Sequence, residues 1–143
     1  MGILHLFDKQ KNIIYIVWDG KVTAEDWLNQ AQKLLAEPDF PSISRLIVDA
    51  QTASDTTSIG EKEIEAVAAL FGTYQETLIK KRMAILANDL FGKASKFGNL
   101  VSRFGVSTVV FNRLDTACIF LALDSADTGQ VLEQIRFQLR SGG

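Results

Sequence analysis

Short apolar runs alternate with helix-like segments along most of this chain. Five runs rich in β-branched and aromatic residues, each bounded by polar or turn-forming residues, predict β-strands. They cover residues 3–7, 13–18, 46–48, 83–87 and 108–111. After the second strand, apolar residues recur at the spacing of amphipathic helices. Strands that alternate with helices predict βαβ units and a mostly parallel sheet.

The first two strands differ from the rest because only the polar segment 8–12 separates them. Such a short connection predicts an antiparallel hairpin. Residues 13–18 are apolar throughout, which is typical of a central strand buried on both faces. We therefore expect an α/β fold: a single mixed, mostly parallel five-stranded sheet with an N-terminal antiparallel hairpin, packed by four to five helices.

Capping residues predict where the first two helices begin. Thr23, followed by two acidic residues, has the features of a helix start. Ser58, with Glu61 three residues later, matches a capping box and predicts a long second helix. The apolar face of that helix extends to Leu78, and Gly72 within it marks close packing or a bend.

In the rest of the chain, Asp49 closes the third predicted strand, and the polar residues 50–58 form the longest predicted loop. Asn88 or Asp89 is expected to cap the helix after the fourth strand. The last helix is expected over residues 128–140, and Phe137 lies off its apolar stripe. We expect residues 1–123 to form one domain, with 124–143 as a helical extension packed on it.

Composition narrows the chemistry that this chain can perform. Its 143 residues include one His and one Cys, so neither an intramolecular disulfide nor a His-His zinc site is expected. Dinucleotide-binding, P-loop and nucleophile-elbow motifs are absent from the sequence. His5 falls in an apolar strand and Cys118 in an apolar helix, where a buried, inert thiol is expected. We expect no cofactor, no metal, no catalytic residues and no enzymatic activity.

Charge and hydropathy limit the classes of partner that this chain is expected to bind. The formal net charge is −2, with −5 in residues 1–71 and +3 in residues 72–143. This balance does not favour nucleic-acid binding, although it allows head-to-tail pairing of two copies. The longest uninterrupted apolar run, residues 13–18, is too short to span a bilayer, and no signal peptide is evident. We expect a cytoplasmic protein without integral membrane association, where an unpaired cysteine stays reduced.

Polar residues at the carboxyl ends of the predicted strands mark a candidate ligand rim, because open α/β sheets bind ligands at that edge. The rim residues are Asp49, Asp89, Asn112 and Arg113. Their alternative role is in ordinary turns and helix caps.

Two further features point to binding. Lys80, Lys81 and Arg82 form a candidate anion patch. Aromatic residues are abundant, and most belong in the core, but some are candidates to line an apolar pocket between the sheet and the long helices. The aromatic residues considered are Trp18, Trp27, Phe71, Phe91, Phe97, Phe104, Phe111 and Phe120.

The order of five local features resembles the SpoIIAA-like branch of the STAS superfamily and is similar to the CRAL-TRIO lipid-binding fold. The features are residues 17–23 (VWDGKVT), 46–49 (LIVD), 82–86 (RMAIL), 91–94 (FGKA) and 109–117 (VVFNRLDTA). The resemblance covers residues 3–123. It implies a small, non-enzymatic bacterial domain with a regulatory or protein-interaction role, binding a protein partner or itself, as a homodimer.

The resemblance also implies two alternatives. In STAS domains of the anti-sigma-antagonist type, phosphorylation of a hydroxyl at a helix start switches binding. Residues 55–60 (DTTSIG) are similar to that segment, so Thr56, Thr57 and Ser58 are the phosphorylation candidates, although Gly60 comes two residues late. The other alternative, from the CRAL-TRIO similarity and the aromatic surplus, is a carrier or sensor of a small apolar, lipid-like ligand.

Overall fold

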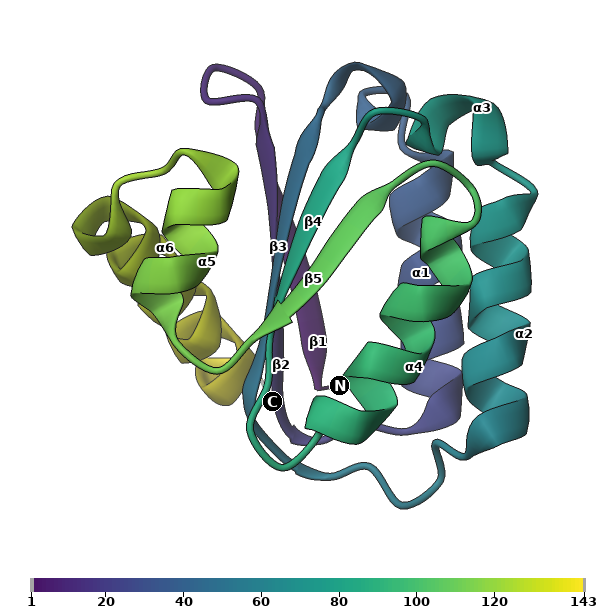
Figure 1. The fold of residues 1–143 in the computed structure, drawn as a ribbon. Coiled ribbons are helices and arrows are strands. Elements are labelled where there is room, and N and C mark those ends of the chain that lie inside the picture. The colour runs from purple at the N-terminus through teal and green to yellow at the C-terminus, as the bar shows by residue number, and fades with distance from the viewer. Residues whose placement is uncertain (1, 143) are drawn as a thin grey trace.

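In the computed structural model, which describes residues 2–142, five strands form one mixed sheet between two layers of helices (Figure 1). The strands are β1 (Ile3–Asp8), β2 (Ile13–Lys21), β3 (Arg45–Asp55), β4 (Arg82–Leu86) and β5 (Ser107–Phe111). The helices are α1 (Ala24–Ala36), α2 (Glu61–Gly72), α3 (Gln75–Leu78), α4 (Phe91–Ser102), α5 (Leu114–Leu121) and α6 (Ser125–Ser141).

The strands lie in the order β1-β2-β3-β4-β5. Only β1 runs antiparallel to its neighbour, and the other three pairings are parallel. The predicted mixed, mostly parallel sheet with an N-terminal hairpin is therefore confirmed.

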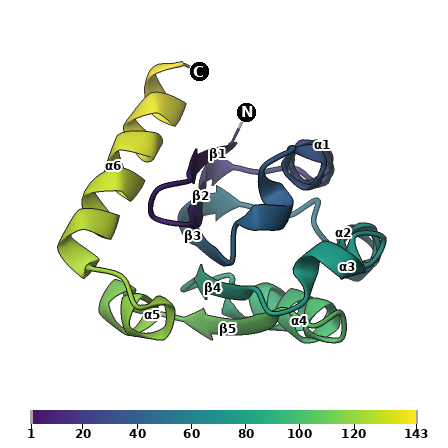
Figure 2. The same ribbon diagram turned by 90° about the horizontal axis from the view of Figure 1, so that it is seen from above.

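The helices cover both faces of the sheet. Helices α1, α2 and α4 lie on one face and α5 and α6 on the other (Figure 2). Alternate residues of β2 supply the two cores: Ile14 and Ile16 belong to the first, and Ile13 and Tyr15 to the second. The prediction that this strand is buried on both faces is confirmed.

Both β2 and β3 run past their predicted ends. Their extensions pair with each other, Asp19 opposite Thr52 and Lys21 opposite Asp55, across two register shifts. The prediction that Asp49 closes the third strand is wrong, and so is the predicted loop over residues 50–55. Local composition suggested a loop because these residues are polar, but backbone pairing with β2 satisfies their N–H and C=O groups.

Helix α2 begins at Glu61, and the prediction that Ser58 caps it is wrong. Gly60 is the N-cap residue, and its N–H donates to Oε1 of Glu63 at 2.7 Å. The Ser58 hydroxyl instead accepts from the N–H of Ala24, the first residue of α1, at 2.9 Å. The loop after β3 is thereby tied to the start of the first helix. Helix α1 itself has the predicted cap, since Thr23 and Asp26 bond reciprocally.

The predicted long second helix is interrupted, so the described chain has six α-helical segments and not four to five. A Cβ atom on Gly72 would lie 2.6 Å from the Phe104 ring, which confirms close packing at this glycine. Helix α2 ends there, and the short α3 carries Leu78 into the core. The predicted cap of α4 is also wrong: Leu90 precedes the helix, and no side chain caps it.

Helix α6 packs against β1 and β2, with Leu132 and Ile135 buried. Two arginines of α6 reach strand carboxylates. Arg136 pairs with Asp49 at 2.5 Å, and Arg140 bonds both oxygens of Asp19 at 2.9 Å. Phe137 is 71% exposed, off the buried stripe as predicted.

Candidate functional site

A cavity of about 70 Å³ lies between the sheet and the layer of α1, α2 and α4. Its lining comes from β2, β3 and β4 below, from the three helices above, and from the loop after β3. Nearly all lining side chains are apolar; the exceptions are Gln30, Thr56 and Lys93. The cavity thus lies in the region where the sequence indicated an apolar pocket.

Four aromatic rings form a continuous wall of this cavity. Trp18 from β2 meets Trp27 from α1 with ring centroids 5.4 Å apart. Trp27 meets Phe97 of α4 at 5.1 Å, and Phe97 meets Phe71 of α2 at 5.3 Å. All three contacts are edge-to-face, a favourable geometry for aromatic pairs. The chain of rings ties β2 and the three helices together.

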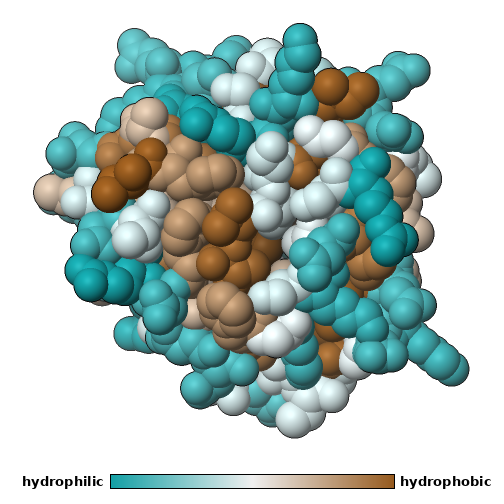
Figure 3. All heavy atoms as spheres, viewed as in Figure 1, coloured by the Kyte–Doolittle hydropathy of each residue, from teal (hydrophilic) through white to brown (hydrophobic). Residues whose placement is uncertain are grey.

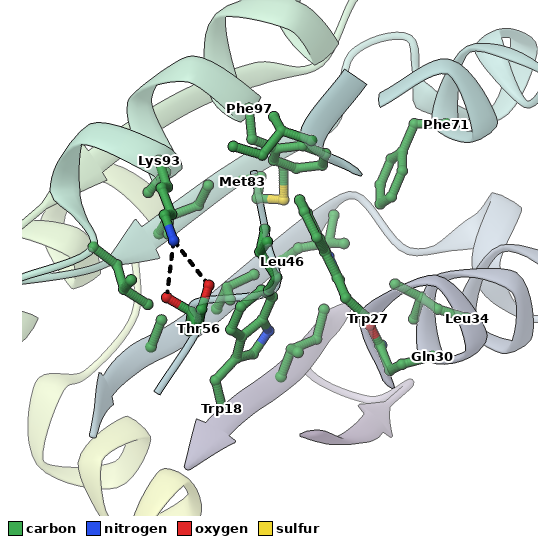
Figure 4. Close-up of a pocket in the computed structure, with 18 residues that line it drawn as sticks. Trp18, Trp27, Gln30, Leu34, Leu46, Thr56, Phe71, Met83, Lys93 and Phe97 are labelled. Carbon is green, nitrogen blue, oxygen red and sulfur yellow. Dashed lines mark hydrogen bonds between the residues drawn. The ribbon is translucent and has the colours of Figure 1, made fainter. Parts of the chain in front are cut away.

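The polar groups lie at the ends of the cavity (Figure 4). Lys93, in the first turn of α4, donates from Nζ to the carbonyl oxygen of Thr56 at 2.8 Å and to its hydroxyl at 3.3 Å. Thr56 is buried and Lys93 is half-buried. Gln30, on α1, donates to Nδ1 of His5 at 3.2 Å, and burial lowers the pKa of that histidine.

Lys93 and Gln30 were not among the predicted site residues. A signal for Lys93 is present in the sequence, because Leu90 and Phe97 are three residues before and four residues after it. That spacing places Lys93 on the apolar face of α4. A lysine on the buried face of a helix is unusual enough to mark a candidate site.

The four predicted rim residues do not face this cavity together. Asp49 points to the opposite face of the sheet, where it pairs with Arg136, and the two side chains are only 6% and 7% exposed. Arg113 bonds Asp115 through two contacts, 3.1 and 2.6 Å. Asn112 and Asp89 are exposed, and neither lines the cavity. A shared ligand rim at these four residues stays a prediction.

The predicted anion patch is wrong at its central residue. Lys81 is 3% exposed, and its Nζ donates to the carbonyl oxygens of Phe40 and Ile43. Burial lowers the pKa of Lys81 to about 8. The ammonium of Lys81 binds carbonyl groups of the turn before β3 and is not available to an anion. Lys80 and Arg82, on either side of it in the sequence, are exposed.

The three phosphorylation candidates differ in accessibility. Thr56 is buried against Lys93, whereas Thr57 and Ser58 are exposed. The Thr57 hydroxyl donates to Asp55 at 2.9 Å, and Ser58 accepts from Ala24. Phosphorylation in this loop stays a prediction, with Thr57 and Ser58 as the hydroxyls that a kinase reaches directly.

Cys118 is buried in α5, and burial raises the pKa of its thiol. No group of three or more His, Cys, Asp or Glu side chains within residues 2–142 is placed to hold a metal ion. None of the helices formed by these residues has the length and apolar character that a membrane span requires.

No protein-family model matches this chain, and no curated protein matches it either. Its fold is similar to that of an uncharacterised protein of the DUF3478 family from Shewanella loihica PV-4, which has a SpoIIAA-like fold. The match has a TM-score of 0.53 at 17% identity, and it covers 84% of this chain and 94% of that one. The expected SpoIIAA-like fold is thus confirmed, and at this identity the likeness shows the fold alone.

Proposed function

We propose that this chain binds a small, largely apolar ligand in the cavity between the sheet and α1, α2 and α4, as a carrier or sensor. The cavity itself is the observation that supports the proposal. Protein interiors are ordinarily packed to the density of organic crystals. A cavity lined by four aromatic rings beside a half-buried lysine is typical of ligand pockets, which combine apolar walls with a few polar groups.

The size of the cavity limits the ligand. Its volume is about 70 Å³, whereas an engineered cavity of about 150 Å³ holds one benzene molecule in another protein. Met83 lines the wall, and a methionine side chain adapts readily to a neighbour. A single ring or a short alkyl chain would therefore fit after a small rearrangement.

We propose a binding role without catalysis. The lining includes one amide, one hydroxyl and one ammonium group, from Gln30, Thr56 and Lys93. Among the lining residues described there is no carboxylate, imidazole or thiol to act as a general base or nucleophile. We propose that the chain acts as a cytoplasmic regulatory module that responds to a bound molecule.

Tryptophan fluorescence tests the proposal directly, because both tryptophans of the chain, Trp18 and Trp27, line the cavity. Titration with short-chain and single-ring compounds is expected to shift the emission in a saturable way. Native mass spectrometry of freshly purified protein checks for a co-purified molecule.

Ala94→Leu is the matched control, because Ala94 lines the cavity from α4 and a larger side chain there would fill it. This variant is expected to fold and to lose the saturable response. Absence of any saturable response in the unmodified protein, together with no co-purified mass, would contradict the proposal.

A second proposal concerns self-association through β5. This strand ends the sheet, and its five residues include no charge and no proline to discourage pairing with another chain. Val109 is 40% exposed, and Ile119 of α5 is 79% exposed. Figure 3 shows apolar atoms gathered in the middle of this face. We propose that a second copy pairs its own β5 with this edge.

Light scattering over a concentration series tests the dimer. Val109→Lys is expected to yield monomers where the unmodified chain forms dimers, since like charges would meet across the edge. Phe137→Lys adds the same charge at an exposed position on α6 and is expected to leave the dimer intact. A monomer at all concentrations, or a dimer lost only in the Phe137 variant, would contradict this interface.

A further inference from the structure

We propose that the ligand carries a carboxylate head, held by Lys93 at one end of the cavity, with its apolar body against the aromatic wall. This inference rests on the proposed ligand-binding function and specifies the chemical class of the ligand. It follows from the partners that Lys93 has, from those it lacks, and from the distribution of polar groups in the cavity.

The ammonium of Lys93 is incompletely partnered. It has three N–H donors, and the described structure has two acceptors for them, both on Thr56. The salt bridges found among residues 2–142 include none at Lys93 within 4 Å. Buried charges in proteins are ordinarily paired. Half-buried Lys93 beside the cavity has no carboxylate of the described residues within 4 Å, and Asp55 acts on it only from a longer range. A carboxylate on the ligand would supply a close counterion.

A second lysine of α4, Lys96, can be compared with Lys93. Lys96, one turn further along α4, pairs with Glu61 of α2 at 2.7 Å. The two lysines share a helix, yet only the one outside the cavity has a carboxylate partner from the protein. Lys93 lines the cavity instead.

The number of positive charges in the cavity lining favours a ligand with one negative charge over a phosphate. Lys93 is the only cationic side chain among the lining residues described. One ammonium compensates one negative charge, whereas a phosphate group carries up to two. Asp55 lies near enough to Lys93 for the lysine to contribute to lowering the pKa of its carboxyl. Asp55 would therefore repel a doubly charged group more strongly than a singly charged one. A carboxylate satisfies both conditions.

The remaining lining orients the ligand. Apart from Gln30, whose side chain already bonds His5, polar side chains of the lining are confined to Lys93 and Thr56. An alkyl chain or ring would extend from Lys93 toward Trp18, Trp27 and Phe97. The first turn of α4, which holds Lys93, also presents the positive end of the helix dipole and adds to the attraction.

The experiment compares butanoate with butan-1-ol, two short probes of equal chain length that differ in head-group charge. Binding of each is measured by tryptophan fluorescence and calorimetry for the unmodified chain, Lys93→Met and the matched control Lys96→Met. The unmodified chain is expected to bind butanoate more tightly than butanol. Lys93→Met is expected to weaken butanoate binding about tenfold or more, in line with the strength of hydrogen bonds to charged groups, and to leave butanol binding unchanged. Lys96→Met is expected to change neither.

The proposal requires both the preference for the carboxylate and its loss in Lys93→Met. Equal binding of the two probes by the unmodified chain overturns the proposal. This comparison uses no variant, so a folding defect in Lys93→Met does not affect it. Undiminished butanoate binding by folded Lys93→Met overturns it too. If neither probe binds the unmodified chain, the proposed ligand-binding function fails. If both bind equally, only the carboxylate preference fails, so the two failures can be told apart.

Discussion

Arg136 and Lys93 lie on opposite faces of the sheet, and the protein supplies them with different partners. On the face covered by α5 and α6, Arg136 bonds Asp49, Glu133 and Thr52, so each of its three guanidinium nitrogens has a partner within the protein, and two of these partners are carboxylates. On the face covered by α1, α2 and α4, Lys93 bonds only Thr56, beside a cavity. Arg136 has carboxylate partners within the protein, whereas Lys93 has none among the described residues within 4 Å and borders a cavity. This contrast is the reason to locate ligand binding on the second of these faces.

The largest expected effect comes from breaking the completed face. Arg136→Met would leave Asp49 as a buried, unpaired charge, which is expected to reduce the free energy of unfolding by about 3–5 kcal/mol. The double variant Arg136→Met with Asp49→Leu removes both charges and is expected to recover most of the loss. Urea unfolding measures all three proteins. A single variant as stable as the unmodified chain would show that the pair does not hold α6 to the sheet.

A smaller effect is expected from adding volume to each face in turn. Ala117 of α5 is fully buried against the sheet, so Ala117→Leu is expected to cost about 1–3 kcal/mol through overpacking. Ala94→Leu adds the same atoms beside the cavity and is expected to leave stability unchanged or to raise it. Thermal and urea unfolding compare the two variants. Equal destabilisation would mean that the cavity does not accept volume and that the two faces are packed alike.

A still smaller change in the free energy of unfolding is expected from a substitution in the loop beside the cavity. Ser58→Ala removes the acceptor for the N–H of Ala24 and is expected to cost about 0.5–1 kcal/mol, the ordinary contribution of one hydrogen bond. The neighbouring Thr57→Ala, which breaks only a bond to Asp55 within the loop, is the control. Urea unfolding is the measurement. Indistinguishable midpoints for the two variants would show that the loop is not tied to α1 through Ser58.

The smallest effect concerns the second arginine of α6. The hydrogen bond from Arg140 holds the pKa of Asp19 below its usual value of 3.8. A carboxyl with a lowered folded pKa stabilises the fold above the unfolded pKa, and this contribution disappears as pH falls through the folded pKa. The stability difference between the unmodified chain and Asp19→Asn is therefore expected at pH 7. It should begin to shrink as the pH falls below 3.8 and vanish below the lowered folded pKa of Asp19. A difference that is constant with pH would contradict this role.

The fold was largely predictable because its signals are local. The apolar run at residues 13–18 predicted a strand buried on both faces, and Thr23 predicted a helix start, as the structure confirms. Errors arose where distant backbone or side-chain groups replaced local ones. Residues 50–55 are polar yet pair with β2, and Ser58 bonds Ala24 across 34 residues instead of capping α2.

The candidate site was predictable only in part. The aromatic surplus indicated an apolar pocket, and four of the aromatic residues considered line the cavity. Lys81 illustrates the limit, since its neighbours in the sequence suggested an exposed patch, whereas carbonyl groups some 40 residues away bind its ammonium. The spacing of Lys93 from Leu90 and Phe97 was an available signal for its place on the apolar face of α4, but nothing in a single sequence shows which lysine lacks a carboxylate partner.

The sequence by itself determined the α/β fold, the hairpin, the parallel crossovers and the scarcity of thiol and imidazole groups. These depend on hydrophobic periodicity, connection lengths and composition, each of which acts over a few residues or over the whole chain. Only the tertiary structure decided that Arg136 meets Asp49, that Lys93 borders a cavity, and that the cavity exists at all. Ion pairing depends on which side chains meet across the fold, and a cavity is the volume that packed side chains leave unfilled, so neither follows from the order of residues alone.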